Sequence, residues 1–556
     1  MCGFVCVIRR NKGKVKIKKN SLFHRGPDYN KLLYTNGVNI RHWRLSIVDL
    51  TKKSNQPMLN SEFAFAYNGE IYDYEKISKS YKLNSKSDTI FLFKYLNKYK
   101  NLKNISNWSG FYSFLYFNKK KNNIIFSRDK IGKKPIYYFL NEDYFIISSE
   151  EKGILDVIKK FKIDYNSIIE YLIFKNIHFG KTYFKNIYLS APGSIGNFDI
   201  QNWKLSFNKS WDSYYNKKLF LVNSNISKKL NKKKFLSLLN TSIEKRANCD
   251  VNFYLAMSSG MDSNLISYLI SKNKNIKNFS SAIGFGIKNI KDENLLARKL
   301  ANKNNIRFHG TYYNQKNFIN DLISCVKAAD APLEHPSYIG YDFLCKNIKN
   351  EGKVLFTGEG SDDLFFGYDH YYKSAKNKSF AFRVFQNENN YKNLANNNKK
   401  IINNIIHKKI RMLIEKTKKS KFYSRDLEFK THLQSLLKRN DRMSMKNSIE
   451  IRSPFLDNQI LKNIGFKTNI KKKYFFRDIL PWHTNYFKKK KIGFYVPFDE
   501  FVNKKYLKNK INPFIELAKK KLYDESNFAI PKKIKFDNKL KWSLLNIGIF
   551  IKFYEK

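Results

Sequence analysis

The hydrophobic pattern of the chain changes near residues 190–230, and this change limits the folds that the chain can adopt. In the first 150 residues, short apolar runs such as 63–67 alternate with clusters of Asn, Gly and Lys, which predicts stacked β-sheets. From about Lys228, strands such as 253–257 alternate with helical stretches such as 262–271. That alternation predicts a parallel sheet covered by helices on both faces. We therefore expect two domains of different class.

Length and cysteine content narrow the class of protein. With 556 residues, 42% of them hydrophobic, the chain can form two to four buried cores. We predict a first domain over 2–190, a linker over 191–230, and a second domain over 231–556 that ends in a helical part. No apolar run approaches the roughly 20 residues of a membrane-spanning helix, so we expect no membrane partner. The five scattered cysteines lack metal-ligand spacing and favour a reducing compartment, which predicts a soluble cytoplasmic protein.

The formal net charge of +59 is the strongest compositional anomaly. A lysine-rich face could bind nucleic acid or another polyanion. Lysine, however, accompanies an excess of Asn, Ile, Tyr and Phe along the whole chain, and the basic residues form no single tail or stripe. We therefore attribute the charge to a compositional bias, of the kind that an AT-rich genome produces, and expect no nucleic-acid partner.

Position 2 holds a cysteine, and removal of Met1 would give this residue both a thiol and a free α-amino group. An unperturbed α-amine has a pKa of about 7.7 to 8.0, so near neutral pH it can accept the thiol proton directly or through a water. Cys2 is therefore a candidate nucleophile, on the condition that Met1 is removed.

Several short motifs follow Cys2, and each of them alone would suggest only a turn or a strand. They are His24-Arg25-Gly26-Pro27-Asp28, Arg44-Leu45-Ser46-Ile47-Val48-Asp49, Tyr67-Asn68-Gly69-Glu70-Ile71-Tyr72 and Ser87-Asp88-Thr89. In this order behind Cys2, they resemble the class II glutamine amidotransferase domain, and the resemblance covers essentially residues 2–155. It implies an α+β N-terminal-nucleophile sandwich with the layer order αββα.

Hydrolysis of a glutamine side-chain amide passes through a tetrahedral oxyanion, so the site needs hydrogen-bond donors where that charge develops. The resemblance assigns this role to Asn68 and the Gly69 N–H. The α-carboxylate and α-ammonium groups of glutamine call for a guanidinium and a carboxylate, which the resemblance finds in Arg44 and Asp88. It also lines the glutamine pocket with Leu45, Ser46, Ile47, Val48 and Glu70. In this family the histidine of the first motif is architectural, and we assign it no role as the base for the nucleophile.

A strand, a turn of small residues and the start of a helix are predicted over 255–264, with the sequence Ser258-Ser259-Gly260-Met261-Asp262-Ser263 in the turn. Such a turn aims backbone N–H groups at an anion. It resembles the pyrophosphate-binding loop of the N-type ATP pyrophosphatases, which cut ATP between the α and β phosphates, and it lacks the ending of a Walker A motif. That family usually has glycine in place of Ser259, where a Cβ could crowd a phosphate or oppose a positive φ.

A second glycine-rich loop follows a later predicted strand and reads Thr357-Gly358-Glu359-Gly360-Ser361-Asp362. With the first loop, it resembles the glutamine-hydrolysing asparagine synthetases, where two such loops face each other across ATP. The resemblance implies that Asp262 and Asp362 bind Mg²⁺, which prefers carboxylate oxygens. Glu359 would orient or deprotonate the attacking ammonia, or help to form the acyl-adenylate. The implied nucleotide contacts are Met257, Ser258, Gly260, Asp262, Ser263, Ile283, Thr357 and Gly358.

Further matches follow in the last third of the chain. They are Asp441-Arg442-Met443-Ser444-Met445, Glu450-Ile451-Arg452-Ser453-Pro454-Phe455-Leu456-Asp457, and Lys473, which by resemblance neutralises phosphate charge as the adenylate forms. The chain departs from the family at Asp363 and Ser453, and at Ala331 in Asp330-Ala331-Pro332. These departures bear on the acceptor substrate more than on the fold. The Asn- and Lys-rich segment 386–421 is predicted to be helical or partly disordered, with no assigned chemistry.

The resemblance implies a two-site enzyme with glutamine, ATP and aspartate as substrates. Cys2 would release ammonia from glutamine, ATP would convert aspartate to a β-aspartyl-adenylate and pyrophosphate, and ammonia would displace AMP to give asparagine. A homodimer is one option for the assembly. Two alternatives stay open: a relative that amidates another carboxylate, on a cell-surface sugar or a secondary metabolite, and a non-catalytic basic protein that binds nucleic acid on the same scaffold.

Overall fold

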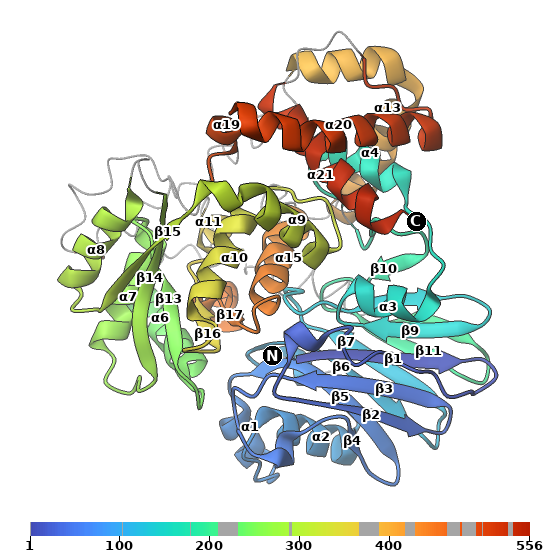
Figure 1. The fold of residues 1–556 in the computed structure, drawn as a ribbon. Coiled ribbons are helices and arrows are strands. Elements are labelled where there is room, and N and C mark those ends of the chain that lie inside the picture. The colour runs from blue at the N-terminus through green and yellow to red at the C-terminus, as the bar shows by residue number, and fades with distance from the viewer. Residues whose placement is uncertain are drawn as a thin grey trace.

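The computed structural model of the 556-residue chain describes most of the sequence (Figure 1). The described residues are 2–102, 104–177, 179–208, 232–287, 292–365, 388–417, 429–463, 479–480, 496–502, 504–531 and 537–555.

Two antiparallel six-stranded sheets, stacked face to face, form the first domain (Figure 1). From edge to edge the first sheet contains β10 (Ile187–Leu189), β8 (Tyr137–Leu140), β9 (Tyr144–Ser148), β1 (Cys2–Arg9), β3 (Val38–Arg44) and β2 (Tyr29–Thr35). The second contains β12 (Lys204–Phe207), β11 (Ile195–Asp199), β7 (Asn123–Arg128), β6 (Gly110–Asn118), β5 (Phe63–Ile71) and β4 (Met58–Leu59).

The sheets stack because alternate residues of their strands are apolar and face one side. Phe4 and Cys6 of β1 point between the sheets, where they join Ala64 of β5 and Leu115 of β6 in one buried cluster. Helices α1 (Tyr74–Ser80) and α2 (Asp88–Tyr99) cover the outer face of the second sheet, while α3 (Glu151–Ile158) and α4 (Tyr165–Phe174) adjoin the first. This arrangement is the predicted αββα sandwich.

The end of the first domain differs from the prediction. Residues 195–207 were assigned to a linker over 191–230, but β11 pairs with β7 along Ile195–Asp199, and β12 pairs with β11. Pairing satisfies the backbone hydrogen bonds of this segment within the second sheet, so these strands belong to the first domain. Residues 209–231, the rest of the predicted linker, lie outside the described part of the chain.

A parallel five-stranded sheet is the centre of the second domain, in the order β15 (Phe308–Tyr313), β14 (Phe279–Ile287), β13 (Phe253–Ala256), β16 (Val354–Phe356) and β17 (Glu450–Arg452). Leu255 of β13 points to a core shared with α6 (Lys232–Ala247), α7 (Met261–Lys272) and α8 (Glu293–Lys303). Its neighbour Tyr254 points to the opposite core, with α9 (Phe318–Ala329), α10 (Ser337–Ile348) and α15 (His432–Met445). Helices therefore cover both faces, as predicted for the α/β domain.

The order of strands in this sheet determines where a ligand can bind. From β13 the chain passes to β14 and β15 on one side, and then returns to place β16 and β17 on the other. The strand order thus reverses between β13 and β16. In open α/β sheets, ligands bind beyond the carboxyl ends of the two strands at such a switch point.

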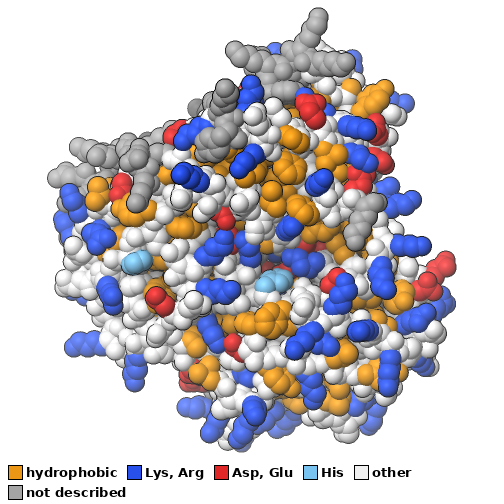
Figure 2. Space-filling model, viewed as in Figure 1, with side chains coloured by type: hydrophobic (Ala, Val, Ile, Leu, Met, Phe, Trp, Pro, Cys, Tyr) orange, Lys and Arg blue, Asp and Glu red, His pale blue; other side chains and the backbone are white. Residues whose placement is uncertain are grey.

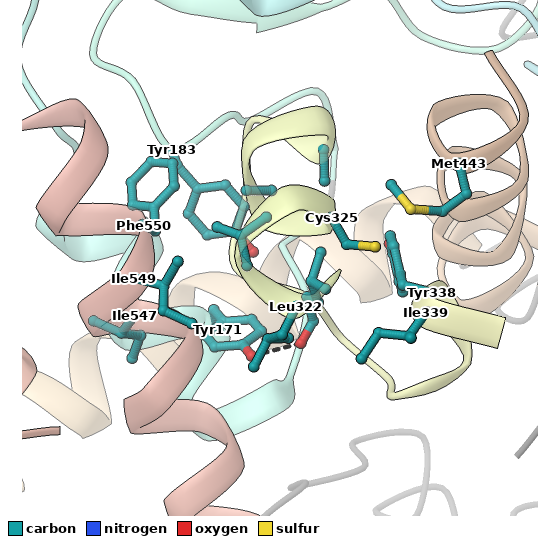
Figure 3. Packing of buried hydrophobic residues seen from close by; sticks show 14 of the residues in the cluster. Tyr171, Tyr183, Leu322, Cys325, Tyr338, Ile339, Met443, Ile547, Ile549 and Phe550 are labelled. Carbon is teal, nitrogen blue, oxygen red and sulfur yellow. Dashed lines mark hydrogen bonds between the residues drawn. The ribbon is translucent and has the colours of Figure 1, made fainter. Parts of the chain in front are cut away.

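The predicted helical C-terminal part packs around α4 of the first domain. It contains α20 (Lys505–Ser526) and α21 (Asn538–Tyr554), and α13 (Glu388–Thr417) contacts α4 as well. Figure 3 shows Phe550 and Ile549 of α21 beside Tyr171 and Tyr183, with Leu322 of α9 next to them. The segment 386–421 is thus helical over its described residues, with non-helical backbone angles at Asn398.

The remaining helices are short: η1 (Phe23–Arg25), η2 (Lys52–Ser54), η3 (Asn104–Asn107), η4 (Gln315–Asn317), α11 (Ser361–Leu364), η6 (Pro454–Leu456), α16 (Asn458–Asn463) and α19 (Phe498–Phe501). Over the described residues, no helix has the length and apolar character that a bilayer crossing requires. Figure 2 shows Lys and Arg side chains spread over the described part of one face of the molecule.

Candidate active sites

Cys2 begins β1, at the boundary between the two domains. It is paired in register with Arg44 of β3, and its backbone N–H donates to Oδ1 of Asn68 at 3.1 Å. Burial raises the pKa of the Cys2 thiol, and the N-terminal charge, the Leu45 N–H and the positive charge of Arg44 partly oppose that rise. A buried thiol of this kind needs an adjacent base to become a nucleophile.

Asn68 and Gly69 lie side by side on β5, as the oxyanion assignment requires. Asn68 is fully buried, and its Nδ2 faces Ser113 Oγ at 3.4 Å. A Cβ on Gly69 would lie 2.3 Å from the carbonyl oxygen of Phe111 on β6. Glycine is therefore the residue that lets β5 and β6 approach closely beside the nucleophile.

The Arg44 guanidinium is held by the loop that follows β3. Nη1 donates to the Thr51 carbonyl at 2.6 Å and to Asn55 Oδ1 at 2.7 Å, and Nη2 donates to the Asp49 carbonyl. Asp49 N donates in turn to Asp250 Oδ2 of the second domain at 2.8 Å. These bonds fix the plane of the guanidinium.

Asp88 occupies the first turn of α2, behind the N-cap Ser87, whose side chain accepts from Ile90 N. Its Oδ2 accepts from Tyr67 OH at 2.6 Å and from Ile71 N at 3.1 Å. Burial raises the pKa of Asp88.

The pocket wall also reaches into the second domain. Arg452 of β17 donates to Glu70 Oε2 at 3.4 Å and to Glu450 Oε1 at 2.8 Å, so one guanidinium joins the glutamine pocket to the parallel sheet. Burial and the charge of Asp88 raise the pKa of Glu70 well above its ordinary value, against the attraction of Arg452. The other predicted lining residues fall into two groups. Leu45 and Ile47 are buried in a core shared with the second domain, whereas Ser46 and Val48 are partly exposed.

The first predicted nucleotide loop lies beyond β13, at the switch point of the sheet. Ser258 N donates to Ser263 Oγ at 3.2 Å, and Gly260 N donates to Ser258 Oγ at 3.1 Å, so the turn is held by its own hydroxyls. Met257, the first residue after β13, donates from its N–H to the carbonyl of Ile283 in the middle of β14 at 2.9 Å. Ser259 is not among the described residues with positive φ, so the backbone strain that its Cβ could have caused is absent there.

The second predicted loop lies beyond β16, directly opposite the first. Ser361 Oγ donates to Asp262 Oδ1 at 2.7 Å, and a Cβ on Gly358 would lie 2.8 Å from the Cβ of Asp262. Thr357 N donates to the Arg452 carbonyl at 3.0 Å, which ties this loop to β17. The two loops are therefore in contact at this edge of the sheet.

Glu359 lies between its loop and two helices. Its Oε2 accepts from Tyr341 OH of α10 at 3.1 Å, and from Arg439 Nη2 and Asn440 Nδ2 of α15 at 3.0 and 3.3 Å. Only 10% of its side chain is exposed. A carboxylate so held is oriented toward the space between the loops and α15.

Asp262 and Asp362 fit the chemistry of a magnesium site. Mg²⁺ is usually bound by one or two carboxylates and substrate phosphates, with waters completing the octahedron. Asp262 is buried and Asp362 is partly exposed at the start of α11. Within the described ranges, no group of three or more His, Cys, Asp and Glu side chains gathers, so phosphate oxygens would have to complete the coordination. Lys473 falls outside the described residues.

Several residues at these sites were not singled out for a role by sequence. Lys133 of the first domain donates to Ser453 Oγ at 2.7 Å, and Ser453 Oγ lies 3.4 Å from Thr357 Oγ1. Burial lowers the pKa of Lys133 well below its ordinary value. Arg439 and Asn440, which hold the second loop through Glu359, lie in no sequence motif.

Two family models match the chain, one in each domain. The model for the glutamine amidotransferase domain matches residues 1–211, and the model for asparagine synthase matches residues 234–526. Glutamine-hydrolysing asparagine synthetase 1 of Bacillus subtilis is 25% identical over 93% of this chain and 89% of its own length. Amidase chry2 of Gibberella zeae is 25% identical over 62% of this chain and 54% of its own. Among solved structures, a glutamine phosphoribosylpyrophosphate amidotransferase from B. subtilis has a TM-score of 0.28 and 12% identity, over 56% of this chain and 81% of that one.

Proposed function

The chain belongs to the asparagine synthase family, and on that premise we propose that it is an ATP-dependent, glutamine-hydrolysing asparagine synthetase. Glutamine is the nitrogen donor, and aspartate and ATP are the other substrates. One observation carries the proposal: a cysteine at the start of β1 lies beside Asn68, while two loops meet at the switch point of the second sheet. A single chain thus combines a candidate glutaminase pocket with a candidate adenylating pocket.

In the glutaminase step, the Cys2 thiolate attacks the amide carbon of glutamine. The thiol proton passes to the α-amine that removal of Met1 exposes, and then to the leaving nitrogen, so that ammonia and a γ-glutamyl thioester form. Water hydrolyses the thioester to glutamate. Asn68 Nδ2 and the Gly69 N–H stabilise the oxyanion, while Arg44 and Asp88 bind the α-carboxylate and α-ammonium groups of glutamine.

In the synthetase step, ATP binds across the two loops. The β-carboxylate of aspartate attacks the α-phosphorus, pyrophosphate leaves, and ammonia then displaces AMP from the acyl-adenylate. Activation is needed because oxide is a very poor leaving group, whereas AMP leaves readily. Ser258, Gly260 and Ser263 cradle the pyrophosphate, and Glu359 orients or deprotonates ammonia. Mg²⁺ held by Asp262 and Asp362 would supply charge neutralisation at the phosphates.

The cytoplasm is the proposed compartment, and a homodimer is the proposed assembly if the chain associates. The compartment is proposed from the family resemblance and the scattered free cysteines, all five of which are buried thiols, and the homodimer from the family resemblance alone.

The substitution Cys2→Ala tests the proposal. Asparagine formation from glutamine should disappear, while formation from added ammonium, ATP and aspartate should persist, because the synthetase pocket is left intact. Cys6→Ala is the matched control, since Cys6 is a buried thiol on the same strand that points between the sheets. Equal loss of both activities, or retention of both, would contradict the assignment of Cys2. Formation of AMP with a carboxylate other than aspartate, and none with aspartate, would contradict the acceptor.

A further inference from the structure

The Arg25 side chain connects the nucleophile directly to the second domain. It is fully buried in η1, and its Nε donates to the carbonyl oxygen of Cys2 at 3.1 Å. Nη1 and Nη2 donate to the two carboxylate oxygens of Asp441, on α15, at 2.8 and 3.1 Å. Nη1 also donates to Glu150 at 2.6 Å. Because a guanidinium is a rigid plane, a shift of Asp441 moves the group that holds the Cys2 carbonyl.

The two residues before Asp441 hold the other candidate site. Arg439 Nη2 and Asn440 Nδ2 both donate to Glu359 Oε2, at 3.0 and 3.3 Å. The Arg439 guanidinium also lies 4.3 Å from the centre of the Tyr341 ring, and Tyr341 OH donates to the same Glu359 oxygen. Three consecutive residues of one helix therefore contact the catalytic glutamate of one site and the anchor of the nucleophile in the other.

Helix α15 is suited to transmit a displacement because it is packed on both sides. Leu433 and Leu437 lie in the core beneath one face of the parallel sheet, whereas Met443 lies in the opposite core. Figure 3 shows Met443 beside Cys325 and Tyr338. A helix packed on two sides moves as a body, since its side chains have no space to rearrange separately.

The charges around Arg25 keep the link ionised. Burial opposes ionisation of Glu150, but Lys152, His24, Arg442 and Arg25 outweigh it and hold the pKa of Glu150 well below its ordinary value. Burial also disfavours charge on Arg25, but Asp441 and Glu150 raise its pKa. Removal of one partner of a buried ion pair strongly destabilises a protein, so the contact between Arg25 and Asp441 persists as long as α15 stays in place.

We propose that α15 couples the two active sites, with Asp441 and Arg25 as positioning residues for Cys2. When ATP and the acceptor carboxylate bind, Glu359 changes its partners, Arg439 and Asn440 follow, and Asp441 carries the movement to Arg25 and the Cys2 carbonyl. Occupancy of the second site then raises the glutaminase rate. The inference rests on the proposed function for the identity of the two reactions. Since such coupling is reciprocal for binding, glutamine should in turn tighten the binding of ATP and aspartate.

The test compares Asp441→Asn with Asp342→Asn in the full-length protein. Asp342 of α10 holds the C-terminal end of α15, because it accepts from Lys446 and Asn447 just beyond that helix at 2.7 Å each, but this link lies within the second domain. Glutaminase kcat/KM is measured with and without ATP, Mg²⁺ and aspartate. We expect a stimulation of about 5-fold or more in the wild type and in Asp342→Asn, and close to none in Asp441→Asn. Full stimulation in Asp441→Asn, or none in the wild type, would overturn the coupling.

A second measurement does not depend on the folding of a variant. The rate at which iodoacetamide alkylates Cys2 of the wild-type protein, followed by mass spectrometry of the Cys2 peptide, should change several-fold when ATP, Mg²⁺ and aspartate are added. Equal rates would contradict the proposal. Asparagine formation from ammonium is assayed in parallel, because its absence would refute the proposed function, whereas its presence without stimulation would refute only the coupling.

Discussion

The two candidate sites are built in opposite ways. The pocket around Cys2 collects residues from β1, β3, β5 and α2, and its groups already hold one another, as Arg44 holds the loop after β3 and Asp88 holds Tyr67. In the nucleotide site, each of the two loops is one continuous stretch of sequence, and the loops meet at one edge of a sheet. The first site depends on antiparallel register, in which a slip of one residue reverses every side chain, whereas the second depends on strand order.

The largest expected effect separates the chemistry of the two sites. Glu359→Gln removes the carboxylate that Arg439 and Tyr341 orient, so asparagine formation from ammonium should fall by about 10²- to 10⁴-fold. The unstimulated glutaminase rate should remain. Glu351→Gln is the control, because Glu351 accepts from Tyr254 OH at the opposite end of the parallel strands. A Glu359 variant with normal asparagine formation would remove this residue from the mechanism.

The second-largest expected effect falls on the glutaminase reaction. Gly69→Ala forces a Cβ against the Phe111 carbonyl and displaces an oxyanion donor, so glutaminase kcat should fall by about 10²-fold or more. Synthesis from ammonium should continue. Gly13→Ala is the matched control, since the nearest atom to its new Cβ belongs to the flexible Asn11 side chain. If Gly69→Ala hydrolysed glutamine normally, the oxyanion assignment would have to be abandoned.

Sequence alone could predict the second site more fully than the first. The loops after β13 and β16 are contiguous motifs, and a parallel sheet necessarily places their carboxyl ends at one edge. In the first site, the residue types were predictable. The hydrogen bonds that Thr51 and Asn55 accept from Arg44 were not, because they depend on the path of a loop that no sequence pattern specifies.

Contacts between the domains could not be predicted. Arg25 and Asp441 are 416 residues apart, and neither residue type requires the other. The same holds for Lys133 and Ser453, which are separated by 320 residues. The linker prediction began too early because it was drawn at the Ala-Pro-Gly turn of residues 191–193, although Trp203, Leu205 and Phe207 alternate with polar residues, and β11 pairs with β7.

The third prediction concerns the junction between the two sites. Arg452→Met would leave Glu70 and Glu450 buried without their shared cation, so the free energy of unfolding should fall by about 3–5 kcal/mol. Urea denaturation measures the change. Arg298→Met is the control, since Arg298 is exposed on α8 and its loss should cost far less. Equal losses in the two variants would show that the junction contributes little to stability.

The smallest expected effect measures how well Lys130 of the first domain is shielded from water. Burial lowers the pKa of Lys130 to about 7, whereas a lysine in an unfolded chain has a pKa of about 10.4. Between these values the unfolded state binds more protons, so the destabilisation that Lys130 causes decreases as pH rises. Lys130→Met should therefore raise the thermal midpoint by a few degrees at about pH 6.5 and by less at about pH 9. Lys120→Met, whose side chain is 79% exposed, should show no such dependence, and equal gains for Lys130→Met at both pH values would contradict the burial.

Transfer of the amide nitrogen tests the whole account most directly. The wild-type protein is incubated with ATP, Mg²⁺, aspartate and glutamine that carries ¹⁵N in its side-chain amide, and the products are identified by mass spectrometry. The account predicts ¹⁵N-labelled asparagine together with equal amounts of AMP and pyrophosphate. Accumulation of labelled ammonium with no labelled asparagine and no AMP would contradict it.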